Sequence, residues 1–269
     1  MTTPGFPGLA TTEYLRQLRD EGERLAASAA PLDLDTAVLT CPGWTIRDLL
    51  RHIGYVHRWA ARYITERHTQ VTPRLDEAVI LRQDIPDEAL LDRFRAGHAA
   101  LVQALDTAGP GLDCWTFLPG AVSPLAFWAR RQAHETTVHR VDVQLAAADD
   151  HPDPIPAEVA ADGVDELLMG FARRNAKRGP LSDPPRGLFV QLTDGYQWTG
   201  RMGPERAEVA RGWPGPAAGP ADCAVAGPAA DVYLLLWNRR DPGDLPAVEL
   251  TGDPAVLERW RHGVRVTWR

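Results

Sequence analysis

The chain has 269 residues, 44% of them hydrophobic and 24% charged, a composition typical of a globular protein large enough to fold without covalent or metal staples. Its formal net charge of −7 argues against general nucleic-acid binding, because proteins of that class are rich in basic residues. It contains no run of roughly 18 apolar residues, so we expect no transmembrane helix.

The three cysteines, Cys41, Cys114 and Cys223, are far apart and form no CxxC pair. An odd number of cysteines cannot all form internal disulfides, so a reduced protein is predicted. The N-terminus has no basic segment followed by an apolar run, and we therefore expect a cytoplasmic protein without a signal peptide.

The first half of the chain carries the apolar spacing of amphipathic helices. Thr45 and Asp48 have the spacing of a capping box, and Ser123 followed by Pro124 is typical of a helix N-cap with proline in the first turn. Four helices with turn-rich connections predict a helical bundle. The predicted helices are residues 11–30, 42–67, 87–106 and 123–148.

An acidic, proline-rich segment, "DDHPDPIPA", spans residues 149–157 and reads as a linker between two domains, 1–150 and 156–269. After it, helical and strand-like segments alternate, with Asp-Gly and Gly-Pro pairs between the strands. We therefore predict a multi-domain fold in which a four-helix bundle precedes a smaller α+β domain with an antiparallel sheet. The predicted helices are 157–175, 229–240 and 253–263, and the predicted strands are 187–194, 196–203, 207–212, 223–227, 247–252 and 264–268.

The stretch "ARRQAHETTVHRVDVQ", residues 129–144, nearly contains the zinc-protease motif H-E-x-x-H, but the second histidine arrives one residue late. His134 and His139 are therefore about 140° apart around a helix and cannot readily share one ion. Glu135 and His139 are four residues apart and lie on one face. The usable pair of ligands is therefore Glu-x-x-x-His.

A third ligand is expected from His52, which lies on or beside the apolar stripe of the second predicted helix. Two imidazoles and one carboxylate leave coordination positions open, which is typical of a catalytic zinc site, although nickel, iron, cobalt and manganese accept the same donors. His57, five residues further, is expected to face outward or to support the site. In the alternative interpretation the histidines are ordinary packing residues, and Glu135 pairs with Arg131 or Arg140.

Two motifs resemble the mycothiol-dependent maleylpyruvate isomerase family: "CPGWTIRDLLRHIGYVHRWA" and "FWARRQAHETTVHRVDVQLA". The resemblance implies a DinB-like metal-binding bundle with His52, Glu135 and His139 as ligands. The segments "LLLWNRRD" and "TGDPAVLERW" resemble the family's sterol-carrier-like C-terminal domain. They imply a catalytic arginine at Arg240 or the adjacent Arg239, although "WNRR" departs from the usual W-L-x-G-R pattern.

The resemblance also implies a function: an enzyme that uses a divalent metal, most simply zinc, and a low-molecular-weight thiol, mycothiol. In an isomerase the thiolate would add to a cis double bond of a dicarboxylic substrate and leave after rotation; in a transferase it would remain attached to a small electrophile. The arginine-rich, alanine-rich composition fits an actinobacterial source. We expect a monomer or small homo-oligomer, with no nucleic-acid or membrane partner.

Two other classes of function are compatible with the same residues. The protein could be a non-catalytic metal-binding or regulatory module, or a metal-dependent hydrolase that uses bound water. His134 and Asp142 also match family positions, and for both a supporting role at the site and surface pairing with arginine stay open. Cys41 opens the "CPGW" motif but has no histidine partner close in sequence, so we do not assign it a catalytic role.

Overall fold

The computed structural model describes residues 8–72, 77–147, 152–177, 179–213 and 221–266. The chain divides into two compact units. The helical unit contains Ala10–Phe117 and Ala121–Asp153, and the second unit contains residues 154–266 together with Leu118–Gly120. Residue 150, the predicted end of the first domain, lies outside the described residues.

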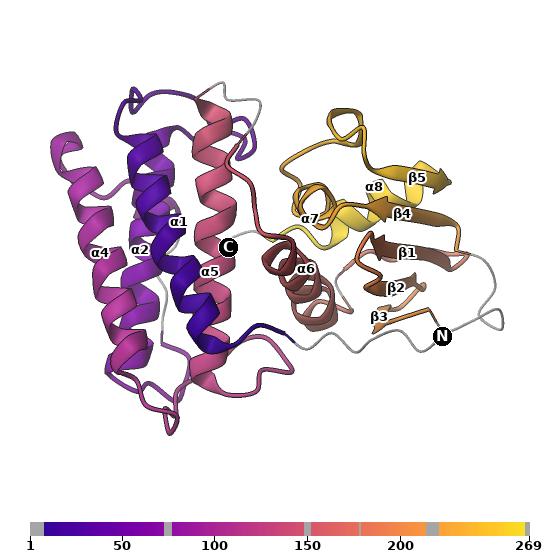
Figure 1. Cartoon of the computed structure of the whole chain (residues 1–269), viewed down its shortest axis with the longest axis horizontal. Helices are drawn as coiled ribbons and strands as arrows, with labels where there is room; N and C mark the ends of the chain where they lie inside the picture. The colour runs from indigo at the N-terminus through magenta and orange to yellow at the C-terminus, as the bar shows by residue number, and fades with distance from the viewer. Residues whose placement is uncertain (1–7, 73–76, 148–151, 178, 214–220, 267–269) are drawn as a thin grey trace. The chain divides into compact units, whose positions relative to one another are not determined.

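Four long helices form the helical unit: α1 (Thr11–Ala29), α2 (Ile46–Thr65), α4 (Asp87–Thr107) and α5 (Pro124–Ala146) (Figure 1). A short helix, α3 (Glu77–Leu81), lies between α2 and α4 in the sequence. The Thr45 side chain accepts a hydrogen bond from the Asp48 backbone and begins α2 with the predicted capping box. Ser123 caps α5, and Pro124 occupies its first turn.

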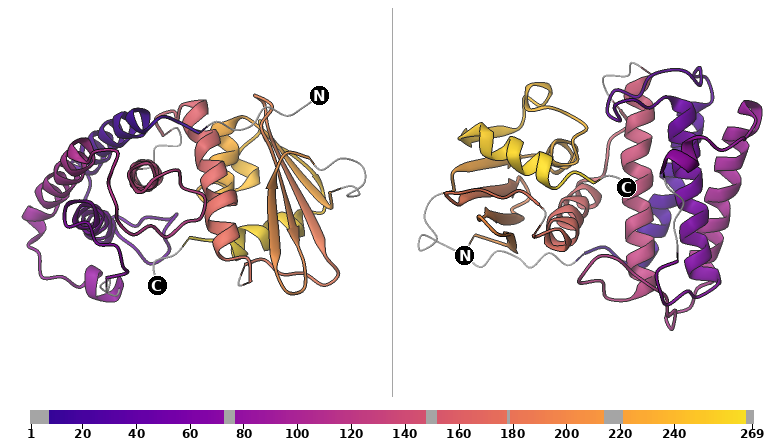
Figure 2. Two further views of the ribbon diagram at one scale, coloured as in Figure 1. Left: turned by 90° about the horizontal axis from the view of Figure 1, so that it is seen from below. Right: turned by 180° about the vertical axis from the view of Figure 1, so that it is seen from behind.

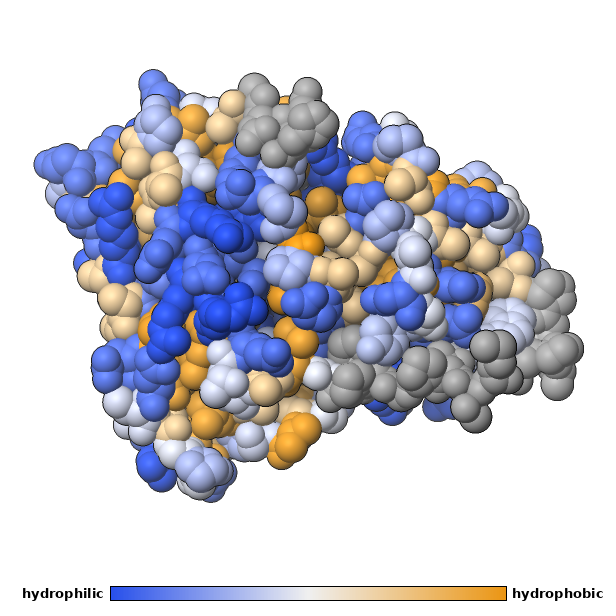
Figure 3. All heavy atoms as spheres, viewed as in Figure 1, coloured by the Kyte–Doolittle hydropathy of each residue, from blue (hydrophilic) through white to orange (hydrophobic). Residues whose placement is uncertain are grey.

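The four long helices close into a bundle because α1 and α2 each pack against both α4 and α5. The apolar stripe of α2, which includes Leu49, Ile53 and Val56, is buried. Hydrophilic side chains gather over the outer surfaces of α1 and α4 in the view of Figure 3, as expected for amphipathic helices. None of the described helices is long and apolar enough to cross a bilayer.

The second unit opens with helix α6 (Ala157–Asp165), which continues into a π-helical turn, η1 (Glu166–Ala172). It contains a five-stranded sheet in the order β3-β2-β1-β4-β5, two further helices and a 3₁₀ turn. The strands are β1 (Arg186–Leu192), β2 (Gln197–Met202), β3 (Ala207–Arg211), β4 (Cys223–Gly227) and β5 (Glu249–Gly252); the other elements are α7 (Ala229–Leu236), η3 (Pro242–Asp244) and α8 (Pro254–Gly263).

The sheet has one covered face. Leu188, Val190 and Leu192 alternate as buried residues along β1, and Trp198 and Met202 do so along β2. The helices of this unit lie on one side of the sheet, among the residues that the structure describes (Figure 2). The fold is therefore the predicted helical bundle followed by a smaller α+β unit.

Two details of the predicted sheet are wrong. The pairing of β1 with β4 is parallel, so the sheet is mixed, although its other pairings are antiparallel. The strand predicted over 264–268 does not form at 264–266, and its last two residues lie outside the described residues. The backbone N–H of Val264 instead donates to the Trp260 carbonyl, so this residue ends helix α8 rather than beginning a strand.

Candidate metal centre

Helix α2 points the His52 side chain into the bundle, where it is fully buried. Its neighbours Leu49 and Ile53 are buried as well, so the imidazole belongs to the same apolar face of α2. The His52 ring lies 4.8 Å from the Trp44 ring, centroid to centroid. Packing on both sides therefore fixes the orientation of this imidazole.

Helix α5 brings Glu135 and His139 to the same place from the other side. The two residues are four apart, and both are less than one tenth exposed. Glu135 Oε1 lies 3.4 Å from His52 Nε2 and 3.5 Å from His139 Nε2. One donor atom from each of the three side chains lies within 4.8 Å of the other two. The structure thus brings together the three residues predicted as metal ligands.

Arg131 lies one turn before Glu135 and holds its second carboxylate oxygen, with Nη2 2.9 Å from Oε2. Both side chains are buried. Burial alone would raise the pKa of Glu135, but contacts with His139 and His52 and the charge of Arg131 hold that pKa well below its usual value. Glu135 is therefore ionised, and its Oε1 atom faces the two imidazoles as an anionic donor.

The other nitrogen of His139 is held by Asp142. His139 Nδ1 donates to Asp142 Oδ2 over 2.9 Å, and this carboxylate also accepts from Thr40 Oγ1 over 2.6 Å and from Cys41 Sγ over 3.5 Å. Burial would lower the pKa of His139, but its contacts with Asp142, Cys41 and Glu135 raise that pKa well above its usual value. Asp142 thereby fixes the ring with Nε2 turned toward Glu135.

A compact loop, residues 38–44, brings Thr40, Cys41 and Trp44 to this place. Its backbone folds on itself, since the N–H of Val38 donates to the Trp44 carbonyl and the N–H of Trp44 donates to the Cys41 carbonyl. The Trp44 ring stacks on the His139 ring at 17° and 6.2 Å. The loop therefore forms an aromatic wall and a sulfur-bearing edge beside the three converging side chains.

For two neighbouring histidines the structure excludes one of the two placements that the sequence left open. His57 does not face outward: it is fully buried, and its Nε2 donates to Thr136 Oγ1 over 2.9 Å. His134 does not pair with arginine at the surface: it is also fully buried, and its ring packs edge-on against Tyr14. Neither belongs to the group of three converging donors. Asp142, for which surface pairing had also stayed open, is fully buried against His139.

Arg239 and Arg240, the predicted catalytic arginines, follow α7 in the second unit and are partly exposed. Arg239 Nη1 donates to the Trp237 carbonyl over 2.7 Å, which turns its guanidinium back toward its own helix. The carbonyl of Arg240 accepts a hydrogen bond from Arg261. Arg240 therefore has its backbone fixed by a neighbouring helix, and its assignment remains an expectation from the resemblance.

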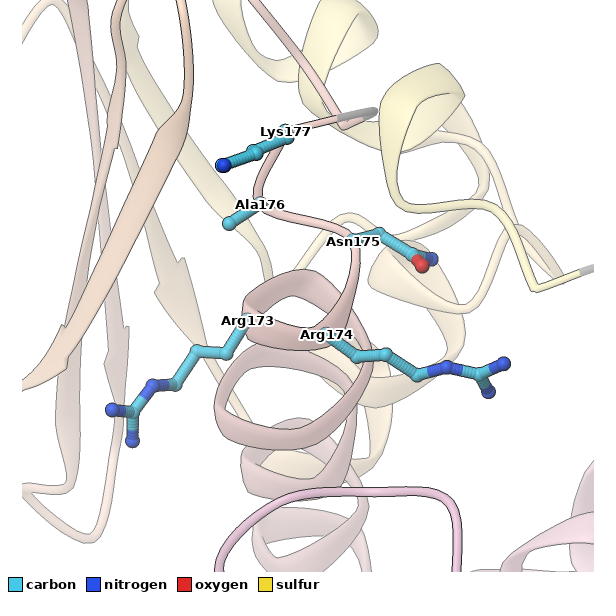
Figure 4. Close-up of a pocket in the computed structure, with 5 residues that line it drawn as sticks. All are labelled: Arg173, Arg174, Asn175, Ala176 and Lys177. Atoms are coloured by element: carbon cyan, nitrogen blue, oxygen red, sulfur yellow. The ribbon is translucent and has the colours of Figure 1, made fainter.

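The second unit also has a hollow of about 460 Å³ lined by Arg173, Arg174, Asn175, Ala176 and Lys177. Arg173 and Lys177 point to one side of this segment, and Arg174 and Asn175 point to the other (Figure 4). These cations follow the end of the helical segment η1, where positive charge offsets the partial negative charge of the helix terminus. The five described lining residues include no carboxylate, imidazole or thiol.

Sequence reasoning missed the part of the site that depends on long-range contacts. Cys41 and Asp142 meet although they are 101 residues apart, and Cys41 also contacts the His139 imidazole. The only local signal for the loop was the "CPGW" motif directly before the capping box of α2. The motif indicates a turn, but nothing in its sequence says which helix that turn faces.

Comparison with known proteins follows the two structural units. Residues 15–144 match the family model described as the mycothiol maleylpyruvate isomerase N-terminal domain, and residues 158–259 match the MDMPI C-terminal domain. The fold is similar to a crystal structure of mycothiol-dependent maleylpyruvate isomerase, with a TM-score of 0.61 and 16% identity over 93% of this chain and 96% of that one. A histidine-to-alanine mutant of that enzyme gives a TM-score of 0.60. No curated protein matches the chain.

Proposed function

The chain belongs to the mycothiol maleylpyruvate isomerase family, and on that premise we propose that it is a metal-dependent enzyme that uses a low-molecular-weight thiol. The observation that carries the proposal is the convergence of His52, Glu135 and His139 in the interior of the bundle. The reaction would be a cis–trans isomerisation of maleylpyruvate type or the transfer of the thiol to a small electrophile.

The three donors fit a divalent ion. In a tetrahedral site with metal–ligand bonds of about 2.0 Å, donor atoms lie about 3.3 Å apart. The separations from Glu135 Oε1, 3.4 Å to His52 Nε2 and 3.5 Å to His139 Nε2, are close to that value. Two nitrogens and one oxygen suit zinc best, and nickel, iron, cobalt and manganese accept the same set. Three protein ligands leave a position open, as catalytic sites require.

An ion bound there would supply a position at which a thiol loses its proton near neutral pH. The remaining work falls to side chains of this chain. Asp142 orients one imidazole, and Arg131 holds the second oxygen of the Glu135 carboxylate. Trp44 covers both imidazoles with an apolar ring and so limits the access of water to them.

The thiol and the substrate follow from the family. Its solved members are named for mycothiol and maleylpyruvate, and we propose mycothiol as the thiol and a small unsaturated dicarboxylate or another electrophile as the substrate. Arg240, or Arg239 beside it, would bind a substrate carboxylate, because a guanidinium matches a carboxylate with two parallel hydrogen bonds.

The test combines metal analysis with a turnover assay. The purified protein is incubated with zinc, dialysed and analysed for bound metal, and turnover is measured with and without mycothiol against maleylpyruvate and a panel of electrophiles. We expect His52→Ala to lower the metal content by about one ion per chain and to abolish turnover. His262→Ala, which changes an exposed histidine far along the sequence, serves as the control.

The same assay separates the alternatives. Metal binding without turnover of any electrophile would identify a binding or regulatory module, and hydrolysis that needs no thiol would identify a hydrolase. A protein that binds no metal under any loading condition would contradict the proposal. Arg240→Ala and Arg239→Ala, assayed in parallel, are expected to raise KM for a carboxylate substrate if the corresponding arginine binds it; unchanged kinetics would remove that arginine from the site.

A further inference from the structure

The His139 ring has donor groups at both of its nitrogens. Nε2 faces Glu135 and His52, as described above. Nδ1 faces Asp142, which belongs to a second set of donors. In this set Cys41, His139 and Asp142 each offer a donor atom, and these atoms all lie within 4.8 Å of one another. The second set contains a sulfur, a nitrogen and an oxygen, which are the three donor types that zinc accepts in proteins.

The sulfur–oxygen separation in this second set matches a tetrahedral ion. With a metal–sulfur bond of about 2.3 Å and a metal–oxygen bond of about 2.0 Å, the sulfur and oxygen lie about 3.5 Å apart. Cys41 Sγ lies 3.5 Å from Asp142 Oδ2. The Asp142–His139 pair, now hydrogen bonded at 2.9 Å, would have to open by about 0.4 Å to reach the corresponding nitrogen–oxygen separation.

The two oxygens of the Asp142 carboxylate have different partners. Thr40 Oγ1 donates to Oδ1, whereas both His139 Nδ1 and Cys41 Sγ approach Oδ2. One oxygen is therefore fixed by the loop, and the other points between an imidazole and a thiol. Cys41 is partly exposed, so this side of the cluster is accessible to an ion from solvent.

We propose that Cys41, Asp142 and His139 Nδ1 form a second binding site for a divalent, thiophilic ion, so that the centre holds two ions bridged by the His139 imidazolate. The inference rests on the proposed function, since the second site shares His139 with the first. Binding involves no oxidation: the ion replaces the thiol proton of Cys41 and the proton between His139 and Asp142, and both protons leave to solvent.

The donors compensate most of the positive charge of two ions. With both sites filled, the carboxylates of Glu135 and Asp142, the Cys41 thiolate and the bridging imidazolate would carry four negative charges, against four positive charges on the two ions and one on Arg131, which pairs with Glu135. Buried charges persist in proteins when they are compensated in this way. The thiolate is a soft donor, so this second site should favour zinc and cobalt over magnesium or manganese.

The experiment counts ions and detects sulfur ligation separately. The metal-free protein is dialysed against excess zinc and analysed for bound metal, and a second sample is titrated with cobalt and followed by absorption. We expect two zinc ions per chain and a thiolate-to-cobalt charge-transfer band in the near ultraviolet. Cys41→Ser should bind one zinc ion and lose the band, although serine still donates a hydrogen bond to Asp142.

Two further variants make the result decisive. His52→Ala should keep one ion and keep the thiolate band, because it changes only the first site. Cys223→Ala, which removes a buried thiol of the second unit, should behave as the wild type. One ion per chain in the wild type, or a cobalt spectrum that Cys41→Ser leaves unchanged, would overturn the second site. Thiol-dependent turnover by a protein with a single bound ion would overturn the second site and leave the proposed function intact.

Discussion

Replacing Arg131 by methionine should destabilise the metal-free protein and at the same time tighten its affinity for zinc. Arg131 Nη2 and Glu135 Oε2 are 2.9 Å apart, and the two side chains are only 3% and 9% exposed. Removing one partner of a buried ion pair costs about 3–5 kcal/mol. His139 lies close to the same carboxylate and compensates part of its charge, so we expect a loss near about 3 kcal/mol.

The gain in zinc affinity has an electrostatic cause. At an effective dielectric constant of about 20, two unit positive charges about 5 Å apart repel each other by about 3 kcal/mol. Without the Arg131 charge, the ion becomes the main counter-charge of Glu135. Because 1.4 kcal/mol corresponds to about a tenfold change in affinity, zinc should bind the variant at least about tenfold more tightly.

Urea denaturation with and without saturating zinc measures both effects, and a zinc titration gives the dissociation constant. Arg62→Met is the matched control, because Arg62 and Glu66 form an ion pair of the same i, i+4 spacing on α2 but are 69% and 45% exposed. That change should have little effect on stability, because exposed ion pairs contribute little, and it should leave zinc affinity unaltered. An Arg131→Met protein that binds zinc no more tightly than the wild type would refute the electrostatic reasoning.

Three more predictions concern other parts of the molecule. Asp142→Asn should lower the affinity for the first zinc ion about 10–100-fold, as measured by equilibrium titration. Thr40→Ala, which does not change a contact of His139, should lower that affinity clearly less. Equal losses in the two variants would contradict the role of Asp142 in orienting the His139 ring. Burial lowers the pKa of His57 and His98 below the usual value of 6.5. Below that pH the unfolded chain therefore binds more protons than the folded chain, and protonation favours unfolding. The urea midpoint of the metal-free protein should accordingly fall as the pH drops below about 6.5. The urea midpoint of His57→Gln should fall less steeply with decreasing pH than that of the wild type. Equal slopes for the two proteins would argue against His57 as a source of the acid sensitivity. Gly252→Ala should lower the thermal midpoint of the second unit, since its φ of +86° alone costs an alanine about 1–3 kcal/mol and the new methyl group would meet the backbone of Asp222; an unchanged midpoint would contradict this.

Local sequence signals predicted the helical unit well because they report contacts between residues close in the chain. The capping pairs at Thr45 and Ser123 set the starts of α2 and α5 at the expected positions. The i, i+4 spacing of Glu135 and His139 put both on one helix face. Such signals cannot predict which loop lies beside His139 Nδ1, because Cys41 in that loop is about a hundred residues away in the sequence.

The second unit shows the same limit in its sheet. The strands β1 and β4 pair although β2 and β3 lie between them in the sequence, and no local pattern encodes a parallel partner. The π-helical turn over Glu166–Ala172 likewise has no signal in residue spacing, which predicted a continuous helix. At 264–268, alternating β-branched residues favoured a strand, but the hydrogen bond from Val264 to Trp260 ends a helix there instead.

His52 and Glu135 are 83 residues apart in the chain and meet only when α2 lies beside α5. An ion seeking both ligands on an unfolded chain must first close that long segment, an entropic penalty on the order of 4 kcal/mol. This penalty corresponds to a nearly thousandfold lower affinity of the unfolded chain for the ion, and it follows from chain connectivity alone. Metal capture would accordingly come after the bundle has assembled, so that the order of events during folding is set by where the ligands stand in the chain.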